Sequence, residues 1–392
     1  MPRRPFVPAL ALAAASALAQ PGAAPAPPIV PWEVPEEPGL VVETLAKGLE
    51  HPWALAFLPD GRLLVTERPG RLRLVERNGR VGPPLAGVPA VAAIGQGGLM
   101  DVALAPDFPA TGTLFLTLAV GTEEANRTAV VRARLTPEGL RDVREIWRNP
   151  TPKRGGWHFG ARLLPLPDGT LLVSVGDGGN PNVRLAGRPI RERAQDPKAF
   201  FGKTIRLTPD GGPAPGNPGL ARPELGWDPH LFTIGHRNVQ GLARDPATGA
   251  LWATEHGAQG GDELNRLVAG ANYGWPVVTF SREYSGAAIS GETHRPGMVG
   301  PVSVWTPSIA PSGLAVYRGR ALPALDGALF AGGLMSSDLR ILRFGPDGRP
   351  RRETRLRIDE RVRDVRVGPD GLVYVLTDEA EGRILRVRPR PR

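Results

Sequence analysis

The sequence of 392 residues contains no cysteine, so disulfide bonds cannot contribute to the stability of its fold. Lysine is also scarce, and the formal net charge of +9 is carried almost wholly by arginine. No basic run is interleaved with aromatic residues, as a nucleic-acid-binding surface would require. We therefore expect no nucleic-acid partner, and the arginine excess indicates instead a pocket for a small anionic ligand.

The sequence also lacks an apolar run long enough to cross a membrane as a helix. Its best candidate is VPALALAAASALA, which follows two arginines and ends in small residues, as a signal peptide does. We interpret residues 1–19 as a signal peptide, residues 20–39 as a proline-rich linker and residues 40–392 as one folded domain. A protein organised in this way is expected in the periplasm or outside the cell.

Glycine (50 residues) and proline (44 residues) are abundant, and they separate short apolar runs rather than forming tracts. Six stretches repeat the pattern of an apolar strand, a turn such as Pro-Asp-Gly and a second apolar strand. They start at Trp53, Leu99, Gly160, Val239, Pro311 and Val362. This recurrence predicts an all-β fold, a six-bladed β-propeller of four-stranded antiparallel blades, and fits a β-sandwich poorly. The stretch GLVVETLAKGLE, before the first unit, is expected to pair with the C-terminal strands and close the ring.

Polar residues recur just before the first strand of several units. They are Gln96, His158, Arg237, Asn238, Arg361 and Arg363. Because equivalent positions of propeller blades converge on the central channel, we expect these side chains to meet around one axis. Arginine binds carboxylates with a two-pronged geometry, and a neutral imidazole accepts a proton from a hydroxyl group. The set therefore predicts an anion site with a base, although each residue alone is as easily explained as a structural plug of the channel.

The stretch EHGAQGGDELNRLVAGANYGWP, which starts at Glu255, combines glycines with hard oxygen donors. Glycines let backbone carbonyls turn inward, and Asp262, Glu263 and Asn265 add side-chain oxygens, which Ca²⁺ prefers. The spacing is not that of an EF-hand, and no His/Cys pattern indicates zinc. A calcium site and a solvated acidic turn both remain open.

Several stretches resemble the quinoprotein aldose dehydrogenases, the glucose/sorbosone dehydrogenase family. The resemblance runs from about His51 to the C-terminus. The matching stretches include HPWALAFLPDGRLLVTER, GQGGLMDVALAPDF, HFGARLLPLPDGTLLVSVGDGG, IGHRNVQGLA, EHGAQGGDELNRLVAGANYGWP and RVRDVRVGPDGLVYVLTDE. Together they are specific, because they cover nearly all of the chain after the expected linker.

The resemblance implies a propeller that holds pyrroloquinoline quinone, a tricarboxylate, in its channel together with Ca²⁺. It implies oxidation of the anomeric carbon of an aldose to a lactone, with hydride transfer to the quinone and an external electron acceptor. His158 would be the general base. The residues expected to hold the quinone are Gln96, Arg237, Asn238, Arg361 and Arg363. The ligands expected for calcium are the carbonyls of Gly257 and Ala258 at the quinone, and Glu263 with the carbonyl of Tyr273 at a second, structural site.

Two positions depart from the family pattern. Met335 stands where relatives carry a lysine that helps to bind the quinone, and Trp157 stands where glucose-specific relatives carry an aspartate. The second departure places the chain nearer the broad aldose branch and leaves its sugar open. The sequence is compatible with a monomer or a homodimer.

Two other classes of function compete with this interpretation. A Ca²⁺-dependent propeller hydrolase, such as a lactonase, would need a metal-bound water held by carboxylates, whereas the expected channel is rich in arginine. A non-catalytic sugar-binding propeller would be expected to carry aromatic platforms, and a buried histidine would have no role in it.

Overall fold

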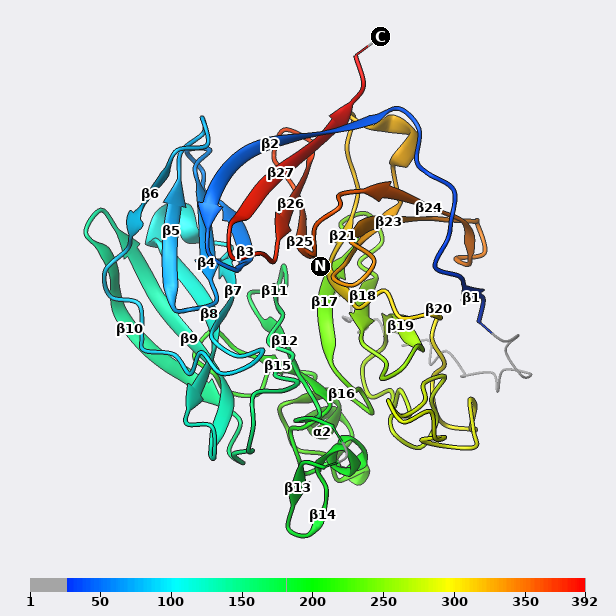
Figure 1. The fold of residues 1–392 in the computed structure, drawn as a ribbon. Coiled ribbons are helices and arrows are strands. Elements are labelled where there is room, and N and C mark those ends of the chain that lie inside the picture. Colours follow the sequence, from blue (N-terminus) through cyan, green and yellow to red (C-terminus); the bar gives the residue numbers. More distant parts are fainter. Residues whose placement is uncertain (1–26, 181, 392) are drawn as a thin grey trace, which may run out of the picture.

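The computed structural model describes residues 27–180 and 182–391, so the expected signal peptide lies outside the described residues. In the described residues, six sheets of antiparallel strands stand around a common axis (Figure 1). The first strand of each sheet lies closest to the axis. These six strands are β3 (Pro52–Phe57), β7 (Leu99–Leu104), β11 (Leu163–Pro165), β17 (Val239–Arg244), β21 (Pro311–Val316) and β25 (Val362–Val367). The predicted six-bladed propeller is confirmed, and each predicted unit corresponds to one blade.

The remaining strands lead outward from the axis in each blade. Blade 1 continues with β4 (Leu63–Glu67), β5 (Arg71–Val75) and β6 (Val81–Pro84), and blade 2 with β8 (Thr113–Gly121), β9 (Asn126–Thr136) and β10 (Gly139–Arg148). Blade 3 continues with β12 (Leu171–Val175), β15 (Lys203–Leu207) and β16 (Leu231–Ile234), and blade 4 with β18 (Leu251–Glu255), β19 (Asp262–Leu267) and β20 (Ser303–Trp305). Blade 5 continues with β22 (Leu329–Gly333), β23 (Asp338–Phe344) and β24 (Pro350–Arg357). Blade 6 contains β26 (Val373–Thr377), β27 (Gly382–Pro389) and β2 (Leu40–Leu49).

Short elements occupy connections between strands within blades 2, 3 and 5. They are the strands β13 (Arg184–Leu185) and β14 (Arg188–Pro189), the helices α1 (Phe108–Thr111) and α2 (Pro218–Ala221), and the 3-10 turns Ile190–Gln195, Pro223–Leu225 and Pro323–Leu325. Within the described part of the chain, none of the helices has the length and apolar character needed to cross a membrane.

The ring is closed by the pairing of the two ends of the folded chain. Strand β2 runs antiparallel to β27, with Leu40 opposite Pro389 and Leu49 opposite Gly382. The expectation for GLVVETLAKGLE is therefore confirmed. In Figure 1 the blue strand β2 lies beside the red strand β27 at the rim of blade 6.

Residues just before β2 are attached to blades 4 and 5. Strand β1 (Ile29–Val30) pairs in parallel with β20 of blade 4. Glu37 then forms a two-pronged ion pair with Arg343 of blade 5, with oxygen–nitrogen distances of 2.7 and 2.9 Å. Two more glutamates of the same segment pair with Arg355 and Arg357 of β24. We call residues 29–37 the N-terminal strap.

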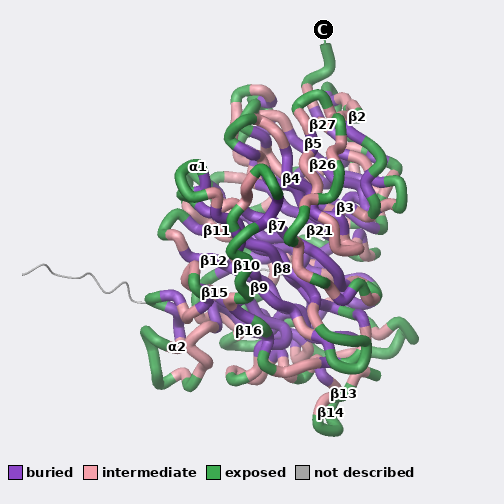
Figure 2. Tube along the Cα trace, turned by 90° about the vertical axis from the view of Figure 1, so that its left-hand side faces the viewer, coloured by how far each residue is buried: buried purple, intermediate pink, exposed green. Residues whose placement is uncertain are grey.

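Apolar side chains from both faces of each sheet pack against the neighbouring blades. One cluster joins Trp53 and Leu64 of blade 1 to Leu99 and Leu116 of blade 2, and equivalent clusters occur around the ring. Figure 2 shows the buried residues (purple) concentrated in the interior, with the exposed residues (green) mostly in the connections. The packing follows from strands that are apolar on both faces, as sheets covered on both sides require.

Buried hydroxyl groups join each blade to the next near the axis. The hydroxyls of Thr66, Thr117, Ser174, Thr254 and Ser312 donate to the carbonyls of Met100, Ala161, Val239, Ser312 and Val362, respectively, at 2.5 to 2.9 Å. Between blade 6 and blade 1, the Asp364 carboxylate accepts the backbone N–H of Leu55 at 3.2 Å. We call these six contacts the inter-blade ring. They fix the height of each first strand relative to its neighbour.

An ion network crosses the axis beside the inter-blade ring. The buried guanidinium of Arg162 donates to Asp364 and to the carbonyl of Gln240, both at 2.8 Å. Arg366 donates to both Asp101 and Asp364 at 2.8 Å. These residues belong to blades 2, 3, 4 and 6, so the network ties together blades that are not neighbours.

We predict that Thr117→Val will destabilise the protein, although the side chains of valine and threonine have nearly the same shape. The substitution strands two buried groups, the carbonyl of Ala161 and the N–H of Asp101, which Thr117 binds at 2.6 and 2.9 Å. Each stranded group should cost about 1–3 kcal/mol of unfolding free energy, measured by urea denaturation. The matched control is Thr293→Val at an exposed position. Equal unfolding free energies for the two variants would contradict the inter-blade ring.

Candidate active site

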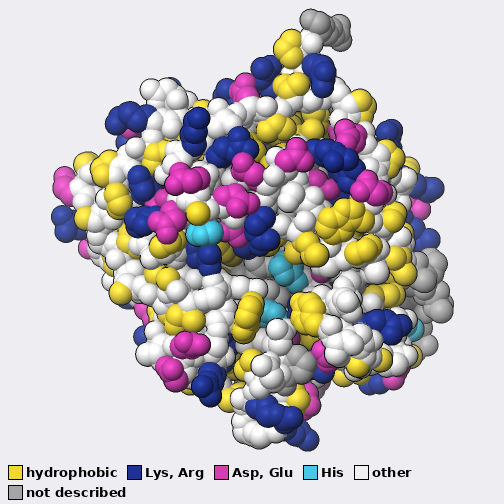
Figure 3. Space-filling model, in the orientation of Figure 1, with side chains coloured by type: hydrophobic (Ala, Val, Ile, Leu, Met, Phe, Trp, Pro, Cys, Tyr) yellow, Lys and Arg dark blue, Asp and Glu magenta, His cyan; other side chains and the backbone are white. Residues whose placement is uncertain are grey.

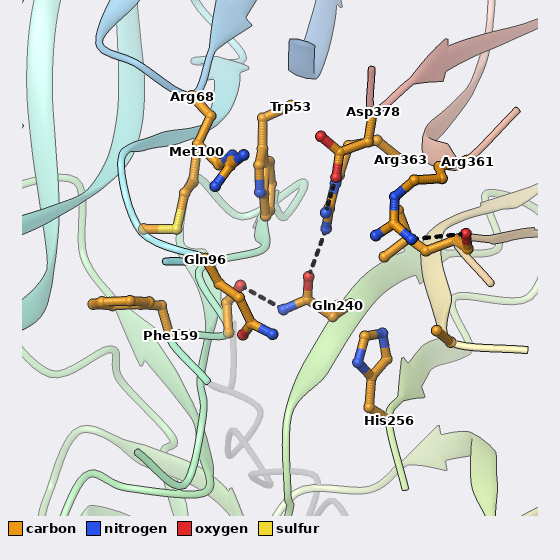
Figure 4. Close-up of a pocket in the computed structure, with 13 residues that line it drawn as sticks. Trp53, Arg68, Gln96, Met100, Phe159, Gln240, His256, Arg361, Arg363 and Asp378 are labelled. Atoms are coloured by element: carbon orange, nitrogen blue, oxygen red, sulfur yellow. Dashed lines mark hydrogen bonds and ion pairs between the residues drawn. The ribbon is translucent and has the colours of Figure 1, made fainter. Parts of the chain in front are cut away.

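A cavity of about 300 Å³ opens at the end of the channel where the first strands begin. Its polar lining consists of Arg68, Gln96, Gln240, His256, Arg361, Arg363 and Asp378. Trp53 stands in the middle of this group in Figure 4, between Arg68 on one side and Arg363 on the other. Figure 3 shows a hollow near the middle of this face, with histidine and hydrophobic surface at its edge.

The lining comes from two recurring positions in the blades. One position lies at or just before the start of the first strand, as for Gln96 and Arg361. The other lies just after the second strand, as for Arg68, His256 and Asp378. Because the first two strands of a blade are antiparallel, the end of the second strand lies beside the start of the first. Both positions therefore face the same end of the channel.

Glycine allows the loops of blades 2 and 3 to touch at this end. Gly95 has a positive φ of 57°, and a Cβ atom there would come within 2.5 Å of the carbonyl oxygen of Gly156. That carbonyl accepts the N–H of Gln96 at 2.7 Å. The glycines of GQGG and GGWHFG thus bring Gln96 against the loop that carries His158.

The cavity wall carries an excess of positive charge. Arg68, Arg361 and Arg363 face it, and the carboxylate of Asp378 is their counter-charge within the lining. Burial alone would raise the pKa of Asp378, but Arg363 and Arg68 hold it below its usual range. Burial, followed by the charges of Arg363 and Arg361, lowers the pKa of Arg68, which Asp378 opposes. The guanidiniums therefore repel one another, and an anion would relieve this repulsion.

Several buried polar atoms of the wall have no hydrogen-bond partner among the described residues. They are Nε of Arg68, Nε of Arg363, Nδ2 of Asn238 and Nε2 of His256. A buried donor without a partner costs about 1–3 kcal/mol. The three arginine and asparagine atoms are all donors, so the wall suits a ligand rich in acceptor oxygens. Arg68, Arg363 and His256 line the cavity. Asn238 stands beside it and accepts a hydrogen bond of 3.3 Å from Gln240, which also lines the cavity.

His158 lies beside this wall and is held from two sides. Its Nδ1 bonds to Oδ1 of Asp177 at 2.6 Å, and its backbone N–H donates to Oε1 of Gln96 at 2.9 Å. The second oxygen of Asp177 accepts the indole N–H of Trp275 at 2.8 Å. The carboxylate places the ring proton on Nδ1 and leaves Nε2 as the basic nitrogen. The φ of His158 is 48°, a costly conformation for a residue with a side chain.

The surroundings of His158 keep its ring neutral. Burial, followed by the positive charge of Arg237, lowers the pKa of His158, whereas Asp177 opposes this effect. The ring is 5 % exposed, so little water reaches it. A neutral imidazole with a fixed tautomer can accept a proton from a bound hydroxyl group.

Arg237 lies outside the large cavity. Its guanidinium binds the carbonyls of His256 and Gly257, and its backbone N–H donates to Glu255 at 2.7 Å. It lines a second cavity of about 10 Å³, together with Gly257, Glu263 and Tyr273. The structure thus divides the predicted residues. Gln96, Arg361 and Arg363 meet in the large cavity, whereas Arg237 and three of the predicted calcium ligands meet in the small one.

Two carboxylates, those of Glu255 and Glu263, line the small cavity. The Nδ2 group of Asn265 donates to both Glu255 and Glu263, at 2.8 and 3.0 Å, and its Oδ1 has no partner among the described residues. Burial and then the charge of Glu255 raise the pKa of Glu263. A cation would stabilise this pair of carboxylates, so the donor set is compatible with calcium.

Other candidate ligands of the segment are already engaged. Asp262 accepts the N–H of Gly257 with one oxygen and the N–H groups of Ile309 and Ala310 with the other. Ala258 donates its N–H to Ser281 at 3.1 Å and lines neither cavity. In residues 27–180 and 182–391, no three His, Cys, Asp or Glu side chains form a metal-binding group. A cation here would therefore need backbone carbonyls in addition to carboxylates.

Sequence reasoning missed four polar residues at or beside the cavity. They are Arg68, Asp177, His256 and Asp378. All four follow the second strand of a blade, so the signal was present in the same repeat and lay at its other end. Met335 and Trp157 are 62 and 47 % exposed. In place of a cation at position 335, the wall offers Arg361, which binds the carbonyl of the neighbouring Leu334 at 3.2 Å.

Comparisons with known proteins identify related chains. The sequence model of the glucose/sorbosone dehydrogenase family matches residues 49–386. An uncharacterised protein of Synechocystis is 49 % identical over 361 residues, covering 90 % of this chain and 87 % of that protein. The aldose sugar dehydrogenase YliI of Escherichia coli is 40 % identical over 358 residues, covering 89 % of this chain and 93 % of that protein.

A solved structure with a bound quinone is similar as well. The aldose sugar dehydrogenase of Streptomyces coelicolor in its PQQ-bound form is 28 % identical, with a TM-score of 0.70, and the match covers 91 % of this chain and all (100 %) of that one. Because the family model spans most of the chain and the relative in Escherichia coli exceeds 30 % identity, the assignment does not depend on one motif. The chain belongs to the glucose/sorbosone dehydrogenase family.

Proposed function

We propose that the protein is a quinoprotein aldose dehydrogenase, which oxidises the anomeric carbon of aldose sugars to a lactone with pyrroloquinoline quinone and Ca²⁺. The observation that carries the proposal is the cationic cavity wall, with its unsatisfied donors, beside a buried neutral histidine. The names of the relatives in Escherichia coli and Streptomyces coelicolor support the same chemistry.

The wall residues fit the carboxylates of the quinone. Arg361, Arg363 and Gln96 line the cavity and would hold the cofactor there, and the free donor of Asn238 lies beside them. Arg237 would contact it from the small cavity, where it also binds the Gly257 carbonyl. When bound, the quinone accepts the hydride of the sugar carbon. The guanidiniums would stabilise negative charge that develops during the reaction.

Calcium would be held by groups in the small cavity and directly next to it. The carbonyls of Gly257 and Ala258 are the proposed ligands at the quinone, and Glu263 with the Tyr273 carbonyl are those of the structural site. The raised pKa of Glu263 and the unpartnered oxygen of Asn265 support a cation there. Because the hydrogen bond from Arg237 occupies the Gly257 carbonyl, calcium would have to share or displace that contact.

His158 would remove the proton of the anomeric hydroxyl group through Nε2. Asp177 holds the ring by Nδ1 and would stabilise the imidazolium that forms. Trp275 fixes the carboxylate of Asp177, and Gln96 fixes the backbone of His158. The ring therefore needs little reorganisation when the sugar binds.

The proposal includes the cellular setting. Export through residues 1–19 would place the enzyme in the periplasm or outside the cell, where an external acceptor would remove the electrons. The lactonase alternative has little support, because the polar lining of the large cavity offers Asp378 as its carboxylate, and Arg363 already binds it.

We predict that purified protein reduces an electron-accepting dye with aldoses only after both pyrroloquinoline quinone and Ca²⁺ are added. Chelation of the metal should abolish most of this activity, because the carboxylate pair and backbone carbonyls bind a divalent cation reversibly. The measurement is dye bleaching with several aldoses, with each addition omitted in turn as the control. No dye reduction and no quinone binding in the complete mixture would refute the proposed function.

We predict that His158→Ala lowers kcat/KM about 10²–10⁴-fold, the usual contribution of a general base. Quinone binding, followed by absorbance, should stay near the wild-type level, because the cationic wall is unchanged. The control is His294→Ala, at an exposed position, which should retain full turnover. Near-normal turnover of His158→Ala would remove His158 from the mechanism.

A further inference from the structure

Lys153 is a buried cation for which the mechanism above gives no role. It is 5 % exposed, and its ammonium group donates to the carbonyl of Gly155 at 2.7 Å. Burial lowers the pKa of Lys153 to about 7, and Asp177 is the charge that opposes this effect. Burying a cation beside a carbonyl rather than a carboxylate is costly, so its position calls for a reason beyond packing.

The contacts of Lys153 enclose the loop that carries His158. Its ammonium group binds Gly155 before the histidine and lies 3.9 Å from the centre of the Phe159 ring after it. Its backbone exchanges two hydrogen bonds of 2.9 Å with Asn126, at the start of β9. Lys153 thus fastens the histidine loop of blade 3 to a strand of blade 2.

Its side chain also reaches the segment that holds the ring of His158. A Cβ atom on Gly178, the residue after Asp177, would come 3.2 Å from Cδ of Lys153. The stem of Lys153 therefore lies against the backbone next to the Asp177 carboxylate. Lys153 therefore contacts residues of the loop that carries His158 and the residue next to Asp177.

Four groups face His158 from different elements. Asp177 follows β12, Arg237 precedes β17, His256 follows β18, and Lys153 precedes the loop itself. Arg237 and Lys153 disfavour a protonated ring, whereas Asp177 favours it. Arg237 exerts the larger of the two positive influences on His158, and Lys153 is a second, separate source of positive charge.

We propose that Lys153 is a positioning residue, which clamps the loop around His158 and, by its positive charge, keeps the ring unprotonated until sugar donates its proton. The inference rests on the proposed role of His158 as the base. Below about pH 7 Lys153 carries its charge, and an imidazolium beside an ammonium group is unfavourable. The base form of His158 therefore persists to lower pH than it would without the lysine.

The test removes the positive charge of residue 153 and keeps the length of its side chain. Lys153→Met should raise the pH at which the His158 ring takes up its proton, measured by NMR titration of the apoprotein. The acid limb of kcat/KM in the reconstituted enzyme should move to higher pH in parallel. One charge nearby in partly screened surroundings should shift both by about half a pH unit or more. Lys47→Met, at an exposed position, is the matched control and should shift neither.

Lys153→Arg keeps the charge but changes the shape of the clamp. It should retain the wild-type titration of His158 even where kcat falls, and this variant keeps the test decisive if Lys153→Met does not fold. An unchanged His158 titration in Lys153→Met, or a shifted one in Lys153→Arg, would overturn the inference. A shifted titration in Lys153→Met, in a protein whose wild type oxidises no sugar, would support the coupling and refute the proposed function instead.

Discussion

The hydrogen bonds from buried hydroxyls to carbonyls of the next blade set the geometry on which the active site depends. Each contact of the inter-blade ring fixes how far one first strand is shifted along the axis relative to its neighbour. The segments that precede these strands consequently arrive at one height. That is why Gln96 of blade 2 and Arg363 of blade 6, more than 250 positions apart, line one cavity. A hydroxyl on an otherwise apolar strand therefore has a consequence at the site, although it touches no ligand.

The polar residues at this end divide into two chemical environments. The large cavity concentrates guanidiniums and unsatisfied donors, whereas the small cavity concentrates carboxylates and backbone oxygens. Arg237 stands at the boundary, since it lines the small cavity and points its charge at the Gly257 carbonyl. Such a separation of charge is expensive in an interior with few counter-ions. It becomes favourable when an anion and a cation bind side by side, as the proposed quinone and calcium would.

Much of this arrangement could be predicted from sequence, because the repeat carries it. The strand–turn–strand units, the closing strand β2 and the convergence of residues before the first strands all follow from periodicity. Arg68, His256 and Asp378 were not predicted, because the prediction considered only the residues before the first strand of each unit and not those after its second strand. The division between two cavities could not be predicted, because it depends on where the long side chain of Arg237 turns in three dimensions. The contacts of the N-terminal strap could not be predicted for a similar reason, because its partners in β20 and β24 lie hundreds of residues away in the sequence.

The pairing of β2 with β27 has a consequence for the order of folding. Blade 6 needs a strand from each end of the chain, so it cannot form until the last strand has left the ribosome. Contacts so distant in sequence are slow to form, and domains that depend on them expose apolar strands in the meantime. Arg361, Arg363 and Asp378 all belong to this last blade. A nascent or truncated chain therefore lacks most of the cationic wall, which is completed only when the ring closes.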